Sequence, residues 1–347
     1  MTSDVAVVGG GPAGAVAALE LARRGARVTL FERSRFGELR MGETLPPAVN
    51  PLLRALGLWD RFAALEPVPS YQTASAWGGT EVAERSFVFS PHGHGWHTDR
   101  ARFDRMLAEA AADAGAEVRT GTAVHGVRRV PDGFVVDAGE PVRAGAVVDA
   151  TGRSARIARA LGAHRESLDR LVCVARVFGL PDGTPPSDTF LEAVADGWWY
   201  VSPLPAGRRL VARFADSRRV AASRLTTDSG WSAALRGTEH TAALVTGAPL
   251  GGLRVVSAAS RYLTPAAGPG WIAVGDAALA VDPLSSGGAA FAFETGSQVP
   301  AVLLDGAAAR YRVFVESATA EYRAVRRRVY GWESRFGTEA FWHDRAS

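Results

Sequence analysis

The sequence predicts an α/β fold in which a Rossmann-like domain is interrupted by an antiparallel β-sheet. The first observation is the stretch 4–32, where an apolar run, a glycine turn, an alanine-rich helix and a second apolar run follow one another. The second is the stretch 166–264, where short β-like segments are separated by Pro, Gly and Asp turns. The third is the return to an apolar strand and a long helix after residue 265. Together they predict a parallel sheet with an inserted antiparallel one.

A G-x-G-x-x-G motif follows the first predicted strand and opens the first predicted helix. Gly9 permits a tight turn, Gly11 lets the backbone approach a pyrophosphate, and Gly14 lets the helix pack closely on the strand. The start of the helix directs free N–H groups toward that pyrophosphate. Glu32 ends the second strand about twenty residues later, where an acid accepts hydrogen bonds from an adenosine ribose. The stretch therefore predicts a dinucleotide site.

The composition is that of an ordinary folded protein, with 347 residues of which 47% are hydrophobic and 22% charged. No apolar run reaches the roughly 20 residues of a membrane span and the first strand starts at once, so we expect a cytoplasmic protein without a signal peptide. The 39 basic residues against 36 acidic ones are all arginine, because the chain contains no lysine. The chain has no basic block with interleaved aromatic residues, so we expect no nucleic-acid partner. Cys173 lies in an apolar run and is expected to be a buried structural thiol.

The middle of the chain is predicted to leave the first domain and return to it. Short β-like runs at 71–96 form the first excursion, and an amphipathic helix over 99–114 leads back. A β-meander over 115–149 then delivers the turn Asp149-Ala150-Thr151-Gly152, whose small residues allow a ligand close to the backbone. A strand at 271–274, the pair Gly275-Asp276 and a helix from about Gly288 complete the domain. The expected division is 1–70, 99–165 and 265–310 for the first domain, 71–98 and 166–264 for the sheet, and 311–347 for a C-terminal helical segment.

Three motifs in combination resemble FAD-dependent monooxygenases with a glutathione-reductase-type FAD domain: the glycine turn with Glu32, the turn at 149–152, and Gly275-Asp276. Further motifs are similar to the tryptophan-halogenase-like branch of that superfamily. They are Gly42-Glu43-Thr44-Leu45-Pro46, Asp99-Arg100-x-x-Phe103-Asp104, Gly197-Trp198-Trp199-Tyr200, Asp282-Pro283-Leu284, and Trp332-Glu333-Ser334-Arg335-Phe336 with Phe341-Trp342. The resemblance runs nearly end to end. It looks nearest to the flavoproteins that act with quinoprotein amine oxidases and modify a tryptophan of a partner polypeptide.

The resemblance implies FAD as the cofactor and assigns roles to individual positions. The residues expected to hold FAD are Gly9, Gly11, Pro12, Ala13, Gly14, Glu32, Arg33, Arg100, Asp149, Gly152, Gly275, Asp276, Pro283, Gly287 and Gly288. The loop 283–288 would lie beside the isoalloxazine, with Glu43, Ser286 and Gly287 as catalytic candidates. The candidates for contact with an aromatic substrate are Trp198, Trp199, Tyr200 and His97, although strand aromatics are as often core residues. No metal site is expected, since His92, His94 and His97 lack a neighbouring set of acids or cysteines.

Two departures from the halogenase pattern bear on the chemistry. Flavin halogenases depend on a lysine that this chain lacks, and the loop that holds their catalytic glutamate and halide-site residues reads Ser285-Ser286-Gly287-Gly288. The resemblance then implies an FAD monooxygenase, not a halogenase, that hydroxylates an electron-rich indole-like ring, free or peptide-bound, with O₂ through a flavin C4a-hydroperoxide. NAD(P)H or a partner flavin reductase would supply electrons. The alternatives are a reductase or dehydrogenase similar to geranylgeranyl reductases, and a flavin-binding maturation helper without turnover.

Overall fold

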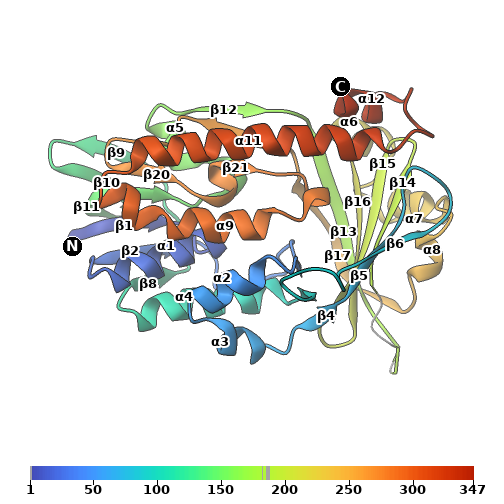
Figure 1. Cartoon of the computed structure of the whole chain (residues 1–347), viewed down its shortest axis with the longest axis horizontal. Coiled ribbons are helices and arrows are strands. Elements are labelled where there is room, and N and C mark those ends of the chain that lie inside the picture. The colour runs from blue at the N-terminus through green and yellow to red at the C-terminus, as the bar shows by residue number, and fades with distance from the viewer. Residues whose placement is uncertain (1, 182, 185–187) are drawn as a thin grey trace.

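The computed structural model describes residues 2–181, 183–184 and 188–347, and its two main sheets stand at opposite ends of the molecule (Figure 1). The N-terminus lies in the first sheet. The long helix α11 (Ala308–Gly331) runs from the first sheet to the second and ends near the C-terminal helix α12 (Ala340–Ala346) (Figure 1). In the described part of the chain, no helix combines the length and apolar character needed to cross a membrane.

The first sheet is mostly parallel and contains the expected βαβ unit. Across the sheet the strands are β19 (Ala267–Gly268), β20 (Trp271–Ala273), β11 (Glu140–Asp149), β1 (Thr2–Val8), β2 (Val28–Glu32) and β8 (Glu117–Thr120), while β10 (Gly133–Ala138) and β9 (Gly126–Val130) extend from β11 as antiparallel strands. Strands β20, β11, β1, β2 and β8 run parallel to one another, whereas β19 is antiparallel to β20. The predicted meander is therefore wrong for β8, which pairs with β2. A parallel neighbour needs a crossover, and helix α4 (Arg100–Asp113) provides it.

Helices α1 (Pro12–Arg23), α4 and α9 (Gly288–Ser297) pack against one another beside this sheet (Figure 1). Small residues allow the close approach, because a Cβ added to Gly296 of α9 would lie 2.7 Å from the carbonyl oxygen of Ala13. The Asp99 carboxylate accepts hydrogen bonds from the N–H groups of Ala101 and Arg102 at 3.0 and 3.2 Å, which caps α4. The shorter helices of this part of the chain are α2 (Val49–Ala55), α3 (Trp59–Ala63), α5 (Arg156–Ala160) and α10 (Val299–Leu303).

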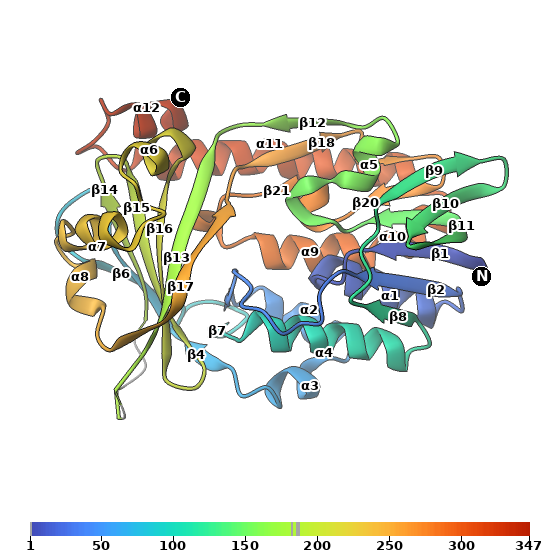
Figure 2. The ribbon, with the colours of Figure 1, turned by 180° about the vertical axis from the view of Figure 1, so that it is seen from behind.

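The second sheet has seven strands and is antiparallel apart from one pair. In order they are β17 (Ala248–Ser257), β13 (Leu171–Gly179), β16 (Arg208–Asp216), β15 (Gly197–Leu204), β14 (Thr189–Val194), β5 (Gln72–Ala76) and β6 (Ala83–Ser86), with β14 and β5 parallel. Figure 2 shows that α6 (Ser217–Ala222), α7 (Asp228–Arg236) and α8 (Thr241–Leu244) cover its outer face. Its inner face is turned toward the first sheet (Figure 2).

Two three-stranded sheets form where the chain passes from one large sheet to the other. One is β3 (Thr44–Leu45), β7 (Gly95–His97) and β4 (Val68–Ser70); the other is β12 (His164–Ser167), β18 (Arg261–Thr264) and β21 (Leu279–Ala280). The strands of the seven-stranded sheet thus come from within the predicted segments 71–98 and 166–264. The residues near the ends of these two segments form strands of the two small sheets. The predicted domain boundaries stay a prediction.

Candidate functional site

The three predicted nucleotide motifs meet at the carboxyl ends of the parallel strands. Val8 and Asp149 are register partners at the ends of β1 and β11, so the turns that follow them are adjacent. A Cβ on Gly275 would lie 2.8 Å from the Cβ of Ala13, which brings the third motif against the start of α1. This edge of a parallel sheet is where α/β folds bind ligands.

The glycine turn is tightly enclosed at two positions and open at the third. A Cβ would lie 2.1 Å from the Ala150 carbonyl oxygen if added to Gly9, and 1.9 Å from the Gly9 carbonyl oxygen if added to Gly14. A Cβ on Gly11 would meet no protein atom within 4 Å. Gly11 is also the N-cap of α1, with no side chain capping the helix. The turn therefore offers open space in front of free helix N–H groups, as a pyrophosphate requires.

Glu32 is held against the glycine turn. Its carboxylate accepts hydrogen bonds from the N–H groups of Gly10 and Ser34 at 2.7 and 2.9 Å and pairs with Arg40 at 2.8 Å. Burial alone would raise the pKa of Glu32, but the hydrogen bonds from Ser34 and Gly10 and the charge of Arg40 together lower it. Glu32 is thus an ionised acceptor at the end of β2, where an adenosine ribose would lie.

Arg153 joins the second motif to the third and was not singled out from the sequence. Its Nε lies 3.3 Å from Oδ2 of Asp276, while its other nitrogens donate to the carbonyl oxygens of Ala259 and Val281 at 2.7 and 2.8 Å. The position of Arg153 directly after Gly152 was the available signal. Arg40, also missed, bridges Glu32 to Asp104 with an Nη1–Oδ2 distance of 2.6 Å, and no motif marks it.

Three further residues were predicted to contact the cofactor, and those contacts stay predictions. The Asp149 carboxylate is 1% exposed and accepts hydrogen bonds from Thr151 N, Thr151 Oγ1 and Ala158 N at 2.9, 2.6 and 2.7 Å, so it shapes the turn from within. Arg100 donates to the carbonyl oxygens of Met41 and Gly42 and to Asp104, which fastens the loop before β3 to α4. Arg33 is exposed on the surface after β2. The side chains of Asp149 and Arg100 both form hydrogen bonds within the protein.

The loop 282–288 leads from the third motif into α9. Its first part is a 3₁₀ turn, Pro283–Ser285, and Ser286 then takes a left-handed conformation with φ 50°. Gly287 is the N-cap of α9 and no side chain caps that helix. A Cβ on Gly288 would lie 4.0 Å from Oδ1 of Asp276, so the loop adjoins the third motif. Ser286 is exposed and Gly287 half-buried.

A second polar group lies where β3, β7 and β15 meet. Thr44 Oγ1 is 2.6 Å from the Tyr200 hydroxyl and 3.0 Å from His97 Nδ1, and Ser202 Oγ is 3.1 Å from the same nitrogen. His97 is fully buried, its Nε2 has no hydrogen-bond partner, and burial lowers its pKa to about 4. The neighbouring Glu43 is 2% exposed and accepts a hydrogen bond from Gly42 N at 3.1 Å. His97 is therefore a neutral, enclosed side chain.

The aromatic residues of β15 divide between the two faces of the sheet. Trp199 lies on the outer face, 1% exposed, with its ring 5.3 Å from that of Trp231 in α7. Trp198 lies on the inner face, 0% exposed, stacked on Phe214 at 3.9 Å. Both are core residues, which is the alternative that the sequence left open for strand aromatics, and Trp199 faces away from the first sheet. Tyr200 is half-buried and points to Thr44.

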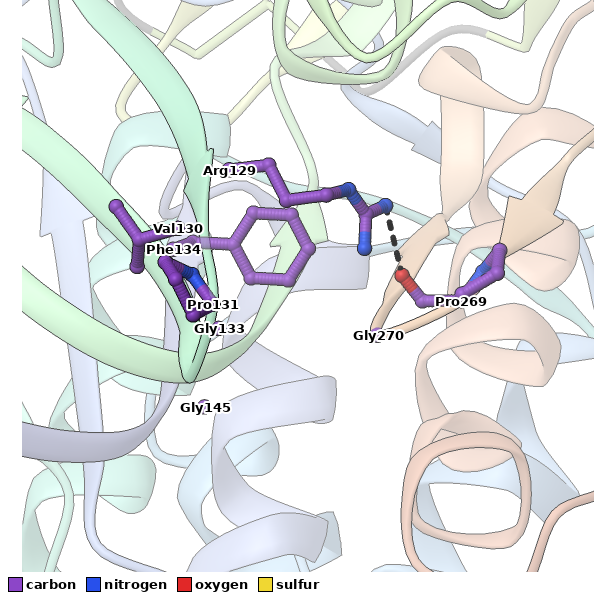
Figure 3. A pocket seen from close by; sticks show the side chains of 8 residues that line it. All are labelled: Arg129, Val130, Pro131, Gly133, Phe134, Gly145, Pro269 and Gly270. Atoms are coloured by element: carbon purple, nitrogen blue, oxygen red, sulfur yellow. Dashed lines mark hydrogen bonds between the residues drawn. The ribbon is translucent and has the colours of Figure 1, made fainter.

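An open hollow at the other end of the parallel strands is separate from these motifs (Figure 3). Phe134 forms part of its wall, and Arg129 crosses it to donate to the Pro269 carbonyl oxygen at 3.0 Å. Gly270, which also lines it, precedes β20, whereas Gly275 follows that strand. Within the described residues, no group of three His, Cys, Asp or Glu side chains is placed to hold a metal ion.

Comparison with known proteins agrees with this geometry. A family model described as an FAD binding domain matches residues 2–298. The chain is 30% identical over 355 residues to LodB of Marinomonas mediterranea, a putative FAD-dependent oxidoreductase, covering 99% of this chain and 96% of the relative. The flavin-dependent halogenase CmlS superposes with a TM-score of 0.86 at 26% identity, covering 99% of this chain and 68% of CmlS. QhpG, a peptidyl tryptophan dihydroxylase essential for tryptophylquinone cofactor biogenesis, superposes with a TM-score of 0.82 at 26% identity, covering 100% and 79%.

Proposed function

The chain belongs to the FAD binding domain family and is an FAD-dependent oxidoreductase, and from this premise we propose that it hydroxylates an electron-rich aromatic ring and does not halogenate it. The observation that carries the proposal is the absence of lysine from all 347 residues. Flavin halogenases use a lysine to deliver the hypohalous species. The loop Ser285-Ser286-Gly287 also lacks the glutamate that halogenases carry there.

The residues of the site fit FAD. The open backbone at Gly11 and the start of α1 would hold the pyrophosphate, and Glu32 would hold the adenosine ribose. Asp276, held beside Arg153, would bind the ribityl or pyrophosphate region. When bound there, FAD would supply redox chemistry with O₂, and NAD(P)H or a partner flavin reductase would be the source of electrons.

The loop 282–288 is the part of the chain that we assign to the isoalloxazine. It ends at the uncapped N-terminus of α9, where free N–H groups favour negative charge such as that of a reduced flavin. Monooxygenation places one oxygen atom of O₂ on the ring and releases the other as water. The chain's contribution is then to hold the ring close to the flavin and to exclude water.

One comparison supports the substrate class, and the burial of the candidate residues supports the choice of the substrate contact. QhpG, which shares the fold at 26% identity, acts on a tryptophan of a peptide. Of the four substrate candidates on this chain, only Tyr200 is less than fully buried, so we assign the substrate contact to Tyr200 and treat His97 as a residue behind it. CmlS has the same fold, so the residues of the loop and the missing lysine, not the fold, separate hydroxylation from halogenation.

The test supplies chemically reduced FAD, ¹⁸O₂, chloride or bromide, and an indole-bearing peptide, and reads the product mass. We expect labelled oxygen on the indole and no halogen. The Gly11→Val variant serves as the control, since product that depends on bound FAD should then be lost. A halogenated product would overturn the proposal. A reduced substrate without label would identify the reductase alternative, and capture of a partner polypeptide without turnover would identify the maturation helper.

A further inference from the structure

A single buried hydroxyl connects helix α11 to both the seven-stranded sheet and the loop before α9. Tyr330, near the end of α11, is 1% exposed. Its hydroxyl donates to Oδ2 of Asp282 at 2.6 Å and accepts a hydrogen bond from Nε1 of Trp198 at 3.2 Å. Residues 198, 282 and 330 are far apart in the sequence, so this contact exists only in the folded chain.

Asp282 is the first residue of the loop and hydrogen-bonds to the turn that follows it. Its Oδ1 accepts a hydrogen bond from Leu284 N at 2.9 Å, and this bond shapes the turn Pro283–Ser285. Its own N–H donates to the Tyr322 hydroxyl at 2.8 Å, and that hydroxyl is 2.6 Å from Ser260 Oγ. The Asp282 side chain is 1% exposed, and burial raises its pKa. A buried carboxyl of this kind needs each of its partners.

Leu284 packs against the core that contains Trp198 and Tyr330, but the packing between the loop and α11 is incomplete. A cavity of about 20 Å³, enough for about one water molecule, lies between the loop and α11 and is bordered by Asp282, Leu284 and Tyr330. Loss of the Tyr330 hydroxyl would therefore leave the turn next to free space. The other end of the connection is rigid, because Trp198 is stacked on Phe214 with an interplanar angle of 11°.

We propose that Tyr330 is a positioning residue that ties strand β15 to the loop 282–288 and so sets the geometry of that loop. Trp198 lies two residues before Tyr200, the proposed substrate contact, so the Tyr330 hydroxyl links the strand of the substrate contact to the loop by hydrogen bonds. We call the two hydrogen bonds that join Trp198, Tyr330 and Asp282 the tie, and its existence is independent of the proposed function. Its consequence for oxygen transfer rests on that function.

The decisive variant is Tyr330→Phe, because phenylalanine keeps the ring and removes only the hydroxyl. The rings of Trp342 and Phe341, at 5.7 and 6.0 Å, retain their neighbour. Tyr311→Phe is the matched control. Tyr311 belongs to the same helix, is equally buried at 1%, and donates one hydrogen bond of 2.6 Å to the Ala273 carbonyl oxygen, away from the loop.

Hydrogen–deuterium exchange of the full chain without FAD measures the tie directly. In Tyr330→Phe, the amides of residues 284–286 should exchange roughly 10- to 100-fold faster, the size expected for losing a hydrogen bond to a charged group. Tyr311→Phe should leave them unchanged. Trp198→Phe, which removes the donor on β15, should raise their exchange by a smaller factor. Unchanged exchange in Tyr330→Phe overturns the tie, and unchanged exchange in Trp198→Phe alone overturns its connection to the sheet.

A second readout follows the reaction. With reduced FAD and the indole-bearing peptide, Tyr330→Phe should consume O₂ but convert a smaller fraction of it into product, while Tyr311→Phe keeps the wild-type ratio. An unchanged ratio in Tyr330→Phe would overturn the consequence for oxygen transfer. If the wild type makes no hydroxylated product, the proposed function fails, and the exchange experiment still decides whether the tie exists.

Discussion

Replacing Gly11 with valine separates cofactor binding from folding, because the protein itself leaves that position open. A Cβ at Gly11 meets no protein atom within 4 Å, and the backbone there is extended, with φ −73° and ψ −179°, which valine adopts readily. The reduced freedom of the unfolded chain stabilises the variant by about 0.4–1 kcal/mol. Valine is a poorer N-cap than glycine by a similar amount. The free energy of unfolding without cofactor should therefore change by less than about 1 kcal/mol.

FAD binding should respond very differently. The new side chain occupies the space in front of the α1 N-terminus, so the pyrophosphate loses roughly two charge-assisted hydrogen bonds worth about 1.5–3 kcal/mol each. A loss of about 3–6 kcal/mol weakens binding roughly 150- to 20,000-fold. Fluorescence titration of the cofactor-free protein with FAD measures the affinity, and urea denaturation measures the stability.

Gly126→Val is the control for this experiment. Gly126 begins β9, has no protein atom within 4 Å of its added Cβ, and lies away from the cofactor motifs. Its replacement should leave the FAD affinity unchanged. Equal affinity of Gly11→Val and wild type for FAD would refute the assignment of the pyrophosphate to this turn. A loss of stability above about 2 kcal/mol in Gly11→Val would refute the inference that the space is open.

Three further predictions concern other residues of the site. Gly14→Ala should lower the free energy of unfolding by about 1–3 kcal/mol or more in urea denaturation, since its Cβ would lie 1.9 Å from the Gly9 carbonyl oxygen; a change under about 0.5 kcal/mol would contradict this. Asp276→Ala should weaken FAD binding roughly 5- to 150-fold in the same titration, and an unchanged affinity would remove it from the site. The unfolded chain takes up a proton on His97 below about pH 6.5, whereas the folded protein accepts it only near pH 4. The free energy of unfolding should therefore fall by up to about 3 kcal/mol as the pH drops through this window. His97→Asn should make this free energy depend less on pH, as measured by urea denaturation at each pH.

The sequence by itself determined the features that local chemistry dictates. The glycine spacing and the apolar runs at 4–32 predicted β1, α1 and β2, because a tight turn and a close helix need glycine at set positions. Short apolar β-like segments between Pro, Gly and Asp turns predicted β13 to β16, since such turns bound each strand locally. The burial of Cys173 was likewise predicted from its apolar neighbours, and it is 1% exposed.

Only the tertiary structure decided which side chains meet. A strand pattern shows that Trp198 and Trp199 point to opposite faces, but which face is covered by α7 depends on distant parts of the chain. The parallel pairing of β8 with β2 depends in the same way on the path of α4. The pair Arg153–Asp276 and the contact between Tyr330 and Asp282 join residues 123 and 48 positions apart. Such contacts leave no periodic signal in the sequence, because they form only after the helices and sheets have packed against one another.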